Sequence, residues 1–456
     1  MTAGLEADLR ALVGDAGVAR ASDSRFHRDA TETQGLQGTP DAVVLPASTD
    51  EVAAVVGWCY ARDLAIVPRG GGSGFAGGCV PVEGGVVVDL QRMRRVRALD
   101  PLLWRMQVEA GLRTSEIHRL ARENGLWFPP DPGAAEQSQI GGNIATNAGG
   151  PHAFKYGVTG RWVTGLEAVV APGEVIEVGG PLRKDVAGYD IASLLIGSEG
   201  TLGIVTAAWL RLIPAPAAAA PVVGAFADAR TACDAIEAVF ASGVVPSAIE
   251  YLDVGALAAA RGTYPFELPD GDALLVLCEA DGTEAEAVAG AAELRAALEE
   301  GAMAVHSPSD PAEVAALWRW RDSVSIAVEA RRGGKVSEDI AVPLDRLADA
   351  IEATLTIGAE HGLEACSWGH AGDGNLHSTF LVDPHDADEV ERAHRAAAAL
   401  FAAAAEMGGS ITGEHGVGWV KRGNLELQWP PAAIELHRAI KRTLDPKNLL
   451  NPGKKT

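Results

Sequence analysis

Two glycine-rich stretches constrain this chain more than any other feature. The first, RGGGSGFAGG, covers residues 69–78, and the second, IGGNIATNAGG, covers residues 140–150. Because glycine has no Cβ, its backbone adopts left-handed conformations and approaches other groups closely. A run of this kind between predicted strands is therefore expected to form an ordered loop that contacts a ligand.

The first stretch matches the pattern G-x-G-x-x-G through Gly72, Gly74 and Gly77, after a predicted strand at residues 64–68. A dinucleotide-binding Rossmann turn needs a helix directly afterwards. Pro81 and the glycine pair at 84–85 prevent a helix of useful length. The prediction is a helix-free loop whose own N–H groups bind a diphosphate, with added charge from Arg69. The alternative is a flexible surface loop.

The second stretch lies within residues 129–157, which are rich in Gly, Pro and Asn and are predicted to form an ordered loop. Asn143, Thr146 and Asn147 offer neutral donors and acceptors that suit the edges of a flat heteroaromatic ring. Each of them could also be a simple turn residue.

The 456 residues exceed what one hydrophobic core usually holds, so more than one domain is expected. The segment IPAPAAAAP at residues 213–221 marks a boundary, since it shows neither strand pattern nor turn chemistry. Beyond it, strands alternate with alanine-rich helices, which predicts an α+β domain with a mainly antiparallel sheet.

Charge and cysteine content exclude several classes of protein. The net charge of -23 argues against nucleic-acid binding. The five cysteines are scattered without any C-x-x-C pair, which argues against an iron–sulfur cluster or a structural zinc site. The N-terminus does not look like a signal peptide and no apolar run is long enough to span a membrane, so a cytoplasmic protein is expected.

At this point a resemblance is plain. The motifs PRGGGSGFAGG, PPDPG, IGGNIATNAGG, KYG, KDVAGYD, LLIGSEGTLGI and LDPKNLLNPGK occur in the order seen in FAD-linked oxidases of the vanillyl-alcohol oxidase/p-cresol methylhydroxylase (PCMH) type. The chain most resembles their D-lactate, D-2-hydroxyglutarate and glycolate dehydrogenase branch. The resemblance implies a PCMH-type FAD-binding domain of two α+β subdomains (1–215), a substrate domain (216–410) and a C-terminal segment (411–456) that returns to the FAD domain.

The resemblance also implies the FAD contacts. Ser73 stands where relatives with covalent flavin often carry histidine, and residues 129–150 contain no cysteine, so non-covalent FAD is expected. Gln139 replaces a small hydroxyl residue common in relatives. The expected FAD-binding residues are Arg69, Gly70, Gly71, Gly72, Ser73, Gly74, Gly77, Gly78, Asp131, Pro132, Ser138, Gly141, Gly142, Asn143, Thr146, Asn147, Gly149, Gly200, Ile204 and Asn451.

The segment HAGDGNLH predicts a hairpin that carries His370 and His377 on its two strands. Two imidazoles and a carboxylate from Glu414, with open positions, suit catalytic Zn²⁺, Mn²⁺ or Fe²⁺. Taken alone, the histidines could equally be structural and hydrogen-bonded. The resemblance implies a divalent metal, preferably zinc, on these three residues.

Four further residues are expected to act on the substrate. His415 has the chemistry of a general base, although a histidine beside a ligand can also be structural. Arg321 matches the arginine of the family that binds the substrate carboxylate, with Arg319 as the solvent-facing alternative. Lys335 is a weaker substrate contact. Asn375 could orient the metal ligands, contact the flavin or serve only as a turn residue.

Together these features predict FAD-dependent oxidation of a small D-2-hydroxy acid to the 2-oxo acid, with a quinone, a cytochrome, an electron-transfer flavoprotein or O₂ as acceptor. Three alternatives stay open: the FAD subunit of a multi-subunit glycolate-oxidase-type complex, a metal-dependent hydrolase, and a flavin-binding protein without turnover. A homodimer is a further expectation, and no nucleic-acid partner is expected.

Overall fold

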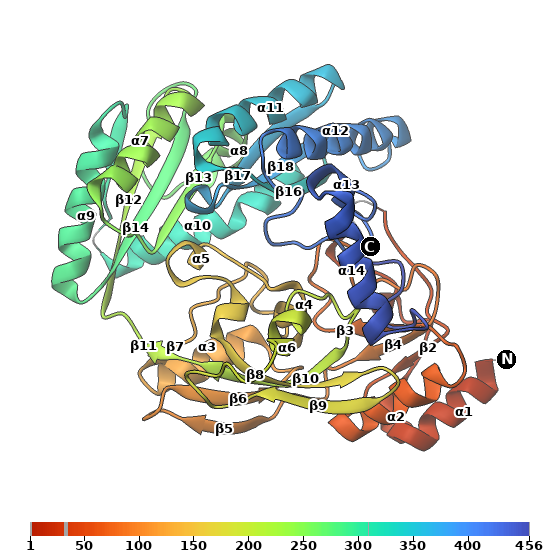
Figure 1. The fold of residues 1–456 in the computed structure, drawn as a ribbon. Coiled ribbons are helices and arrows are strands. Elements are labelled where there is room, and N and C mark those ends of the chain that lie inside the picture. The colour runs from red at the N-terminus through yellow and green to blue at the C-terminus, as the bar shows by residue number, and fades with distance from the viewer. Residues whose placement is uncertain (1, 32–34, 309, 456) are drawn as a thin grey trace. The chain divides into compact units, whose positions relative to one another are not determined.

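A computed structural model describes residues 2–31, 35–308 and 310–455 (Figure 1). The chain forms two compact units. Unit 1 comprises Met1–Gly149, Gly157–Ala215 and Glu414–Thr456, and unit 2 comprises Gly150–Tyr156 and Pro216–Gly413. Helices and strands are mixed, and the α+β class predicted from the sequence is confirmed. Among the described residues, no helix combines the length and hydropathy that crossing a bilayer requires.

The first sheet of unit 1 has the strand order β1-β2-β4-β3. Its strands are β1 (Val18–Ala19), β2 (Ala42–Val44), β3 (Ile66–Arg69) and β4 (Val86–Asp89), and β2 and β3 both run parallel to β4. Helices α1 (Thr2–Val13) and α2 (Thr49–Tyr60) pack their apolar sides on it, with a core that includes Leu9, Val52, Val56 and Ile66. The loop of residues 70–85 joins two adjacent parallel strands without any helix, as predicted.

The second sheet of unit 1 is antiparallel, with the order β5-β6-β10-β8-β9. It contains β5 (Val96–Asp100), β6 (Arg105–Glu109), β8 (Val163–Val170), β9 (Glu174–Gly179) and β10 (Ile204–Arg211). Strands β7 (Leu126–Trp127) and β11 (Ile213–Pro214) form a short separate pair. The remaining helices of unit 1 are α3 (Thr114–Glu123), α4 (Ile140–Thr146), α6 (Ile191–Leu195), α13 (Leu425–Gln428) and α14 (Pro431–Leu444).

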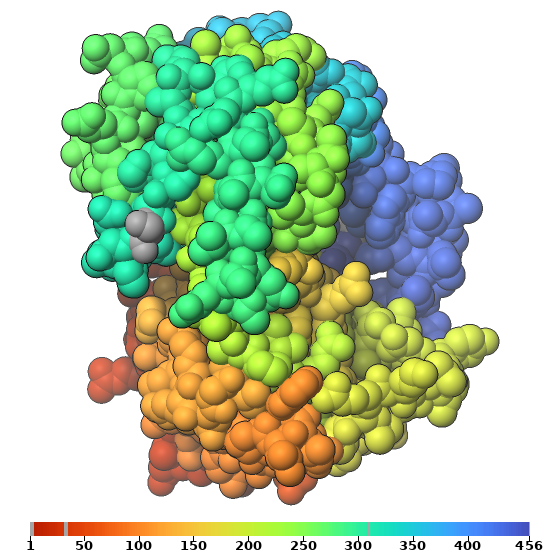
Figure 2. All heavy atoms as spheres, turned by 90° about the vertical axis from the view of Figure 1, so that its left-hand side faces the viewer, coloured from red at the N-terminus to blue at the C-terminus, as the bar shows by residue number. Residues whose placement is uncertain are grey.

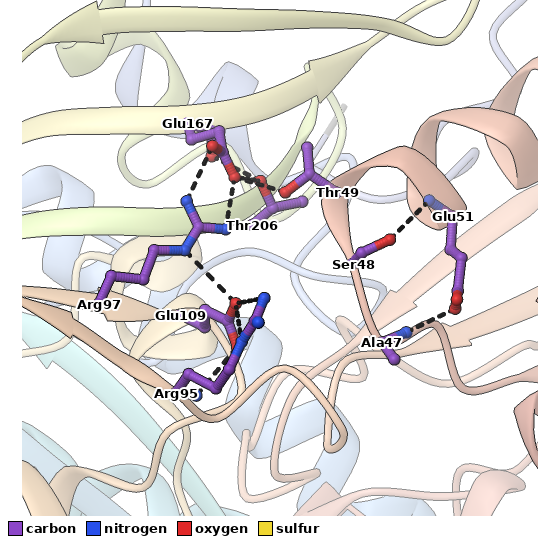
Figure 3. Close-up of polar contacts among 9 residues, drawn as sticks. All are labelled: Ala47, Ser48, Thr49, Glu51, Arg95, Arg97, Glu109, Glu167 and Thr206. Carbon is purple, nitrogen blue, oxygen red and sulfur yellow. Dashed lines mark hydrogen bonds and ion pairs between the residues drawn. The ribbon is translucent and has the colours of Figure 1, made fainter.

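A polar network joins the second sheet of unit 1 to helix α2, which packs on the first sheet (Figure 3). Arg97 on β5 donates two hydrogen bonds of 2.9 Å to the carboxylate of Glu167 on β8 and also pairs with Glu109 on β6. Thr206 on β10 donates to Glu167 at 2.9 Å, and Thr49 at the start of α2 donates to the same carboxylate. Glu167 therefore binds four secondary-structure elements together through one side chain.

Glu167→Gln is expected to lower the free energy of unfolding by about 1–3 kcal/mol near neutral pH, because Arg97 loses a charged partner. Burial raises the pKa of Glu167, but hydrogen bonds from Arg97, Thr49 and Thr206 outweigh it and the pKa lies below its ordinary value. Because the pKa of Glu167 is lower in the folded protein than in the unfolded chain, its charge stabilises the folded protein at pH values above the ordinary glutamate pKa. This stabilisation is lost as the pH falls through the lowered pKa. The difference between variant and wild type should therefore shrink in acid.

Urea unfolding followed by circular dichroism at neutral and acid pH measures this difference. Glu177→Gln is the matched control, because Glu177 lies opposite Glu167 on β9 and is exposed. Equal losses in the two variants would contradict the role of the network.

Unit 2 is built on a seven-stranded sheet, antiparallel throughout, in the order β15-β12-β14-β13-β17-β18-β16. Its strands are β12 (Ala218–Phe226), β13 (Ala248–Leu252), β14 (Leu274–Gly282), β15 (Ala304–His306), β16 (Gly334–Ala341), β17 (Glu364–Gly369) and β18 (Asn375–Val382). The chain passes from unit 1 to unit 2 between Ala215 and Pro216, inside the segment 213–221 that was expected to be a boundary. The expectation that this segment has no strand is wrong, since β11 and the start of β12 lie within it. Pairing with β14 compensates for the poor strand propensity of its alanines.

Helices cover both faces of this sheet. Helices α8 (Val254–Ala260) and α10 (Pro311–Ala330) pack on one face, in a core that includes Leu252, Leu277 and Trp368. The opposite face carries α9 (Glu284–Glu299) and α11 (Leu347–Glu360), as contacts made at Gly224 and Gly358 show. Helices α7 (Ala229–Ser242) and α12 (Ala387–Glu406) pack beside α9 and α11 (Figure 1). Arg321 of α10 and Glu250 of β13 meet on the face that α10 covers.

Candidate functional site

The two glycine stretches lie side by side in unit 1. A Cβ on Gly70 would be 3.4 Å from the Cα of Gly142, and a Cβ on Gly71 would be 2.1 Å from the carbonyl oxygen of Gln137. Gly72 and Gly77 adopt left-handed φ angles of 69° and 70°, which other residues rarely tolerate. The first loop can therefore keep its path only with glycine at these positions.

Arg69 supports this loop from behind. Its guanidinium lies 2.1 Å from where a Cβ of Gly72 would be. It donates to the carbonyl of Arg28 at 2.9 Å and to the sulfur of Cys79 at 3.2 Å, and it pairs with Asp89 at 3.8 Å. Because all of these contacts are with protein groups, they indicate that Arg69 helps to hold the loop in its conformation.

The second stretch contains a helix, and the prediction of an uninterrupted loop over residues 129–157 is wrong. Helix α4 starts after Gln139 and ends at Asn147, whose φ of 56° is left-handed. A second short helix, α5 (Ala153–Tyr156), lies in unit 2. Packing outweighs the low helix propensity of glycine, because a Cβ on Gly141 would come within 2.7 Å of the Cβ of Ala110.

The polar side chains expected at FAD are partly engaged with the protein. Asn143 donates to Thr114 at 2.7 Å, and Ser138 shares a hydrogen bond of 2.8 Å with the same hydroxyl. Asn147 accepts from the N–H of Gly160, and Thr146 donates to the carbonyl of Gly142. These side chains hold the α4 region in place.

Space for a ligand is found mainly beside the glycine backbone of the two stretches. A Cβ on Gly78 or Gly142 would meet nothing within 4 Å, and one on Gly74 would meet only a carboxylate oxygen of Asp29 at 4.0 Å. Gly200 packs against Pro68, and Ile204 is buried in the core. The open glycine backbone of the two stretches fits a flavin dinucleotide, which needs close N–H groups for its diphosphate.

The C-terminal segment returns to this region through residues that the sequence analysis only partly identified. The amide of Asn451 donates to the carbonyls of Gly78 and Glu199, both at 2.8 Å. Glu199, which was not predicted, accepts from the N–H groups of Val417 and Gly418 at 2.9 and 2.6 Å. The motif GSEG could have identified Glu199, because a charged residue in an apolar, glycine-rich segment is expected to need hydrogen-bond partners.

Gly71→Ala is expected to weaken FAD binding about tenfold or more, because the new Cβ would force the loop away from the carbonyl of Gln137 at a cost of about 1–3 kcal/mol. Gly180→Ala is the matched control, because a Cβ there meets nothing within 4 Å. Titration of the apoprotein with FAD, followed by flavin fluorescence, measures both. Unchanged affinity in Gly71→Ala would show that FAD does not depend on this loop.

Unit 2 holds the predicted histidine pair on the hairpin of β17 and β18. The rings of His370 and His377 have centroids 5.3 Å apart and planes at 87°. Both side chains are buried. The turn between the strands ends at Gly374, whose φ of 65° suits glycine. The strand pairing thus brings together two imidazoles that are seven residues apart in sequence.

Glu250 connects His370 to Arg321. The Nδ1 atom of His370 lies 2.6 Å from Oε1 of Glu250, and a guanidinium nitrogen of Arg321 pairs with Oε2. Burial raises the pKa of Glu250, but Arg321 and His370 outweigh this effect and lower the pKa overall. Sequence reasoning missed Glu250, although a lone acid in the apolar strand AIEYL was a usable signal.

Arg321 points into the protein, whereas Arg319 is exposed. Figure 2 shows a face of the molecule on which the green and teal residues of unit 2 are at the surface. The Nε atom of Arg321 is buried and makes no hydrogen bond to the part of the chain that the structure describes. A buried donor of this kind suits an anionic ligand, since leaving it unpaired is costly.

Lys335 and Asn375 have protein partners in unit 2. Lys335 donates to the hydroxyl and carbonyl of Ser325 and pairs with Glu329, and burial lowers its pKa. Asn375 donates to Asp339 at 2.6 Å. Asp339, in turn, lies opposite His377 in the strand register. Asn375 therefore orders the residues around the histidine pair.

Glu414 and His415 lie in unit 1. A carboxylate oxygen of Glu414 is 2.7 Å from where a Cβ of Gly149 would be, at the end of the second glycine stretch. The ring of His415 is 4.8 Å from that of Phe75, in the first stretch. Within unit 1, both predicted residues are therefore beside the glycine loops.

Comparisons with known proteins assign the family. Residues 40–179 match the model "FAD binding domain", and residues 215–455 match "FAD linked oxidases, C-terminal domain". The chain is 38% identical over 423 residues to "Glycolate oxidase subunit GlcD" of Bacillus subtilis, covering 92% of this chain and 90% of that protein. It is 34% identical to "Probable D-lactate dehydrogenase, mitochondrial" of Danio rerio, covering 98% and 90%.

A third relative, "D-2-hydroxyglutarate dehydrogenase" of Xanthomonas citri, is 36% identical over 91% of this chain and 89% of its own length. Among solved structures, p-cresol methylhydroxylase has the same fold, with a TM-score of 0.80 at 19% identity over 98% of this chain and 95% of that one. With these family matches and relatives, the chain is an FAD-dependent oxidoreductase that belongs to the FAD linked oxidase family, in its D-lactate, glycolate and D-2-hydroxyglutarate dehydrogenase branch.

Proposed function

We propose that the protein oxidises a small 2-hydroxy acid, such as glycolate, D-lactate or D-2-hydroxyglutarate, to the 2-oxo acid. The observation that carries the proposal is the buried arrangement in which Glu250 joins Arg321 to His370, beside His377. A 2-hydroxy acid has a carboxylate and an adjacent hydroxyl, and this arrangement offers a cation for the first and metal-type ligands for the second. Bound FAD supplies the acceptor for the hydride.

Arg321 is the proposed partner of the substrate carboxylate. Its Nε is a buried donor without a hydrogen bond to the described residues, and its pairing with Glu250 holds the guanidinium in place. A guanidinium can bind a carboxylate through two parallel hydrogen bonds. Lys335 is a secondary candidate that would act through α10, on which Ser325 and Glu329 lie.

His370, His377 and Glu414 are the proposed metal ligands. The Nδ1 of His370 lies against Glu250, so Nε2 would be the atom that binds the metal, and a carboxylate on the other ring nitrogen is typical of metal-binding histidines. Gly413 donates to Asp339, opposite His377, and Glu414 follows Gly413 directly, with Cα atoms about 3.8 Å apart. Two histidines and one carboxylate suit Zn²⁺, with Mn²⁺ or Fe²⁺ as alternatives, and such an ion would stabilise an alkoxide.

His415 is the proposed base that accepts the hydroxyl proton. An imidazole titrates near neutral pH and can take a proton at that point. Its place beside the glycine loops of unit 1 supports the assignment, since the same loops are the proposed FAD site.

The test mixes the purified holoenzyme anaerobically with D-lactate, L-lactate, glycolate or D-2-hydroxyglutarate and follows flavin absorbance, with and without a chelator. Bleaching by D-lactate, glycolate or D-2-hydroxyglutarate but not by L-lactate, slowed by the chelator, is the expected result. Bleaching by none of them would contradict the proposal, and a chelator without effect would contradict the metal.

The likeness to a glycolate oxidase subunit favours a second candidate, in which this chain is the FAD subunit of a larger complex. Under that alternative, the flavin would bleach with substrate, but reoxidation by a quinone, a cytochrome or O₂ would require partner chains. Membership of an FAD-linked oxidase family favours oxidation over the metal-dependent hydrolase alternative.

A further inference from the structure

Glu250 is the only residue of strand β13, AIEYL, with a charged side chain, and the strand is buried throughout. Its two carboxylate oxygens bind different partners from different elements. Oε1 faces the Nδ1 of His370 at the end of β17, and Oε2 pairs with Arg321 in the middle of α10. One buried side chain thus contacts both groups that the proposed function gives to the substrate and the metal.

A carboxylate buried to this degree is costly unless charged partners and hydrogen bonds compensate it. The contacts that compensate the buried charge also fix the orientation of its partners, because a buried side chain can adopt few other positions. His370 and Arg321 are themselves buried, and the flanking strand residues Leu252 and Leu277 pack in the core under α10. The ring of His370 and the guanidinium of Arg321 are therefore both held by the same carboxylate.

We propose that Glu250 is a positioning residue that couples the carboxylate-binding arginine to the metal-binding histidine, so that the two parts of the substrate site form as one unit. The proposal rests on the proposed function for the identity of the two ligands. It adds that neither Arg321 nor His370 keeps its binding geometry without Glu250.

The experiment uses the FAD-loaded protein, stripped of metal with a chelator. Zn²⁺ is titrated by calorimetry. Oxalate, which offers a carboxylate but has no C–H bond from which a hydride could be transferred, is titrated by flavin absorbance. Glu250→Gln is expected to weaken Zn²⁺ binding about 10- to 100-fold, as loss of the carboxylate behind a ligating histidine does, and to weaken oxalate about tenfold. Thermal unfolding shows whether each variant is folded.

Glu279→Gln is the matched control. Glu279 is equally buried on the neighbouring strand β14, and its partners are Ser247, His152 and Trp318. This variant should bind both probes as the wild type does. If Glu250→Gln fails to fold, Glu250→Asp carries the test, because its shorter side chain keeps the charge but cannot reach both partners.

Loss of both affinities in a folded Glu250 variant, with the control unchanged, supports the coupling. Loss of only one affinity, or of neither, overturns it, and so does a wild type that binds no Zn²⁺. If both probes bind as expected but no 2-hydroxy acid bleaches the flavin, the proposed function fails while the coupling stands.

Discussion

His415→Asn should lower kcat for flavin reduction by about 10²- to 10⁴-fold, the usual contribution of a general base. Asparagine keeps a hydrogen-bonding side chain of similar reach but cannot accept a proton near neutral pH. Because the ring of His415 lies beside Phe75 rather than in the core, the variant should fold and bind FAD normally. The loss should therefore appear in kcat and not in flavin content.

Anaerobic stopped-flow reduction of the bound flavin across a range of pH measures this effect. The wild type should show a rise in rate as an imidazole loses its proton, and the variant should lose that rise. His385→Asn, at an exposed histidine after β18, is the control and should behave as the wild type. A variant that keeps both the rate and its pH dependence would remove His415 from the mechanism.

Arg321→Ala should lower kcat/KM by about 10²- to 10³-fold, since truncating one partner of a buried charge pair costs about 2–5 kcal/mol. Two effects add here. The substrate carboxylate loses its cation, and Glu250 keeps a buried negative charge without Arg321 to balance it. The variant should therefore also unfold at lower temperature.

Arg321→Lys separates these effects, because lysine restores the charge but not the planar pair of donors. Stability should recover more than kcat/KM does. Arg319→Ala is the control, two residues away and exposed on the outer side of α10. Steady-state kinetics with the preferred hydroxy acid and thermal unfolding measure all three. Equal kinetics in Arg319→Ala and Arg321→Ala would contradict the assignment of the carboxylate site.

Short-range patterns predicted much of the fold. The glycine loop at residues 69–78 was predicted to lack a helix because Pro81 follows it, and the structure shows none there. The strands β17 and β18 were predicted as a hairpin because Asp373 and Gly374 form a turn between apolar runs. These features depend on dihedral preferences and side-chain periodicity, which neighbouring residues set.

Helix α4 was not predictable in this way. Glycine and asparagine have low helix propensity. The helix is stabilised by close packing of Gly141 against Ala110, a residue that is distant in sequence. The strand at Ala218–Ala220 likewise depends on its partner β14. In both places, a tertiary contact outweighs a local preference of about 1 kcal/mol.

The same division applies to the candidate site. Residue types and motifs were sufficient to identify the FAD-binding loops, the histidine pair and Arg321 as candidates, because each carries a recognisable chemistry. The role of Glu250 depends on three elements, β13, α10 and the end of β17, that meet only when the sheet of unit 2 assembles. A buried carboxylate is stable only where folding brings its cations to it, so its partners cannot be found by reading along one segment.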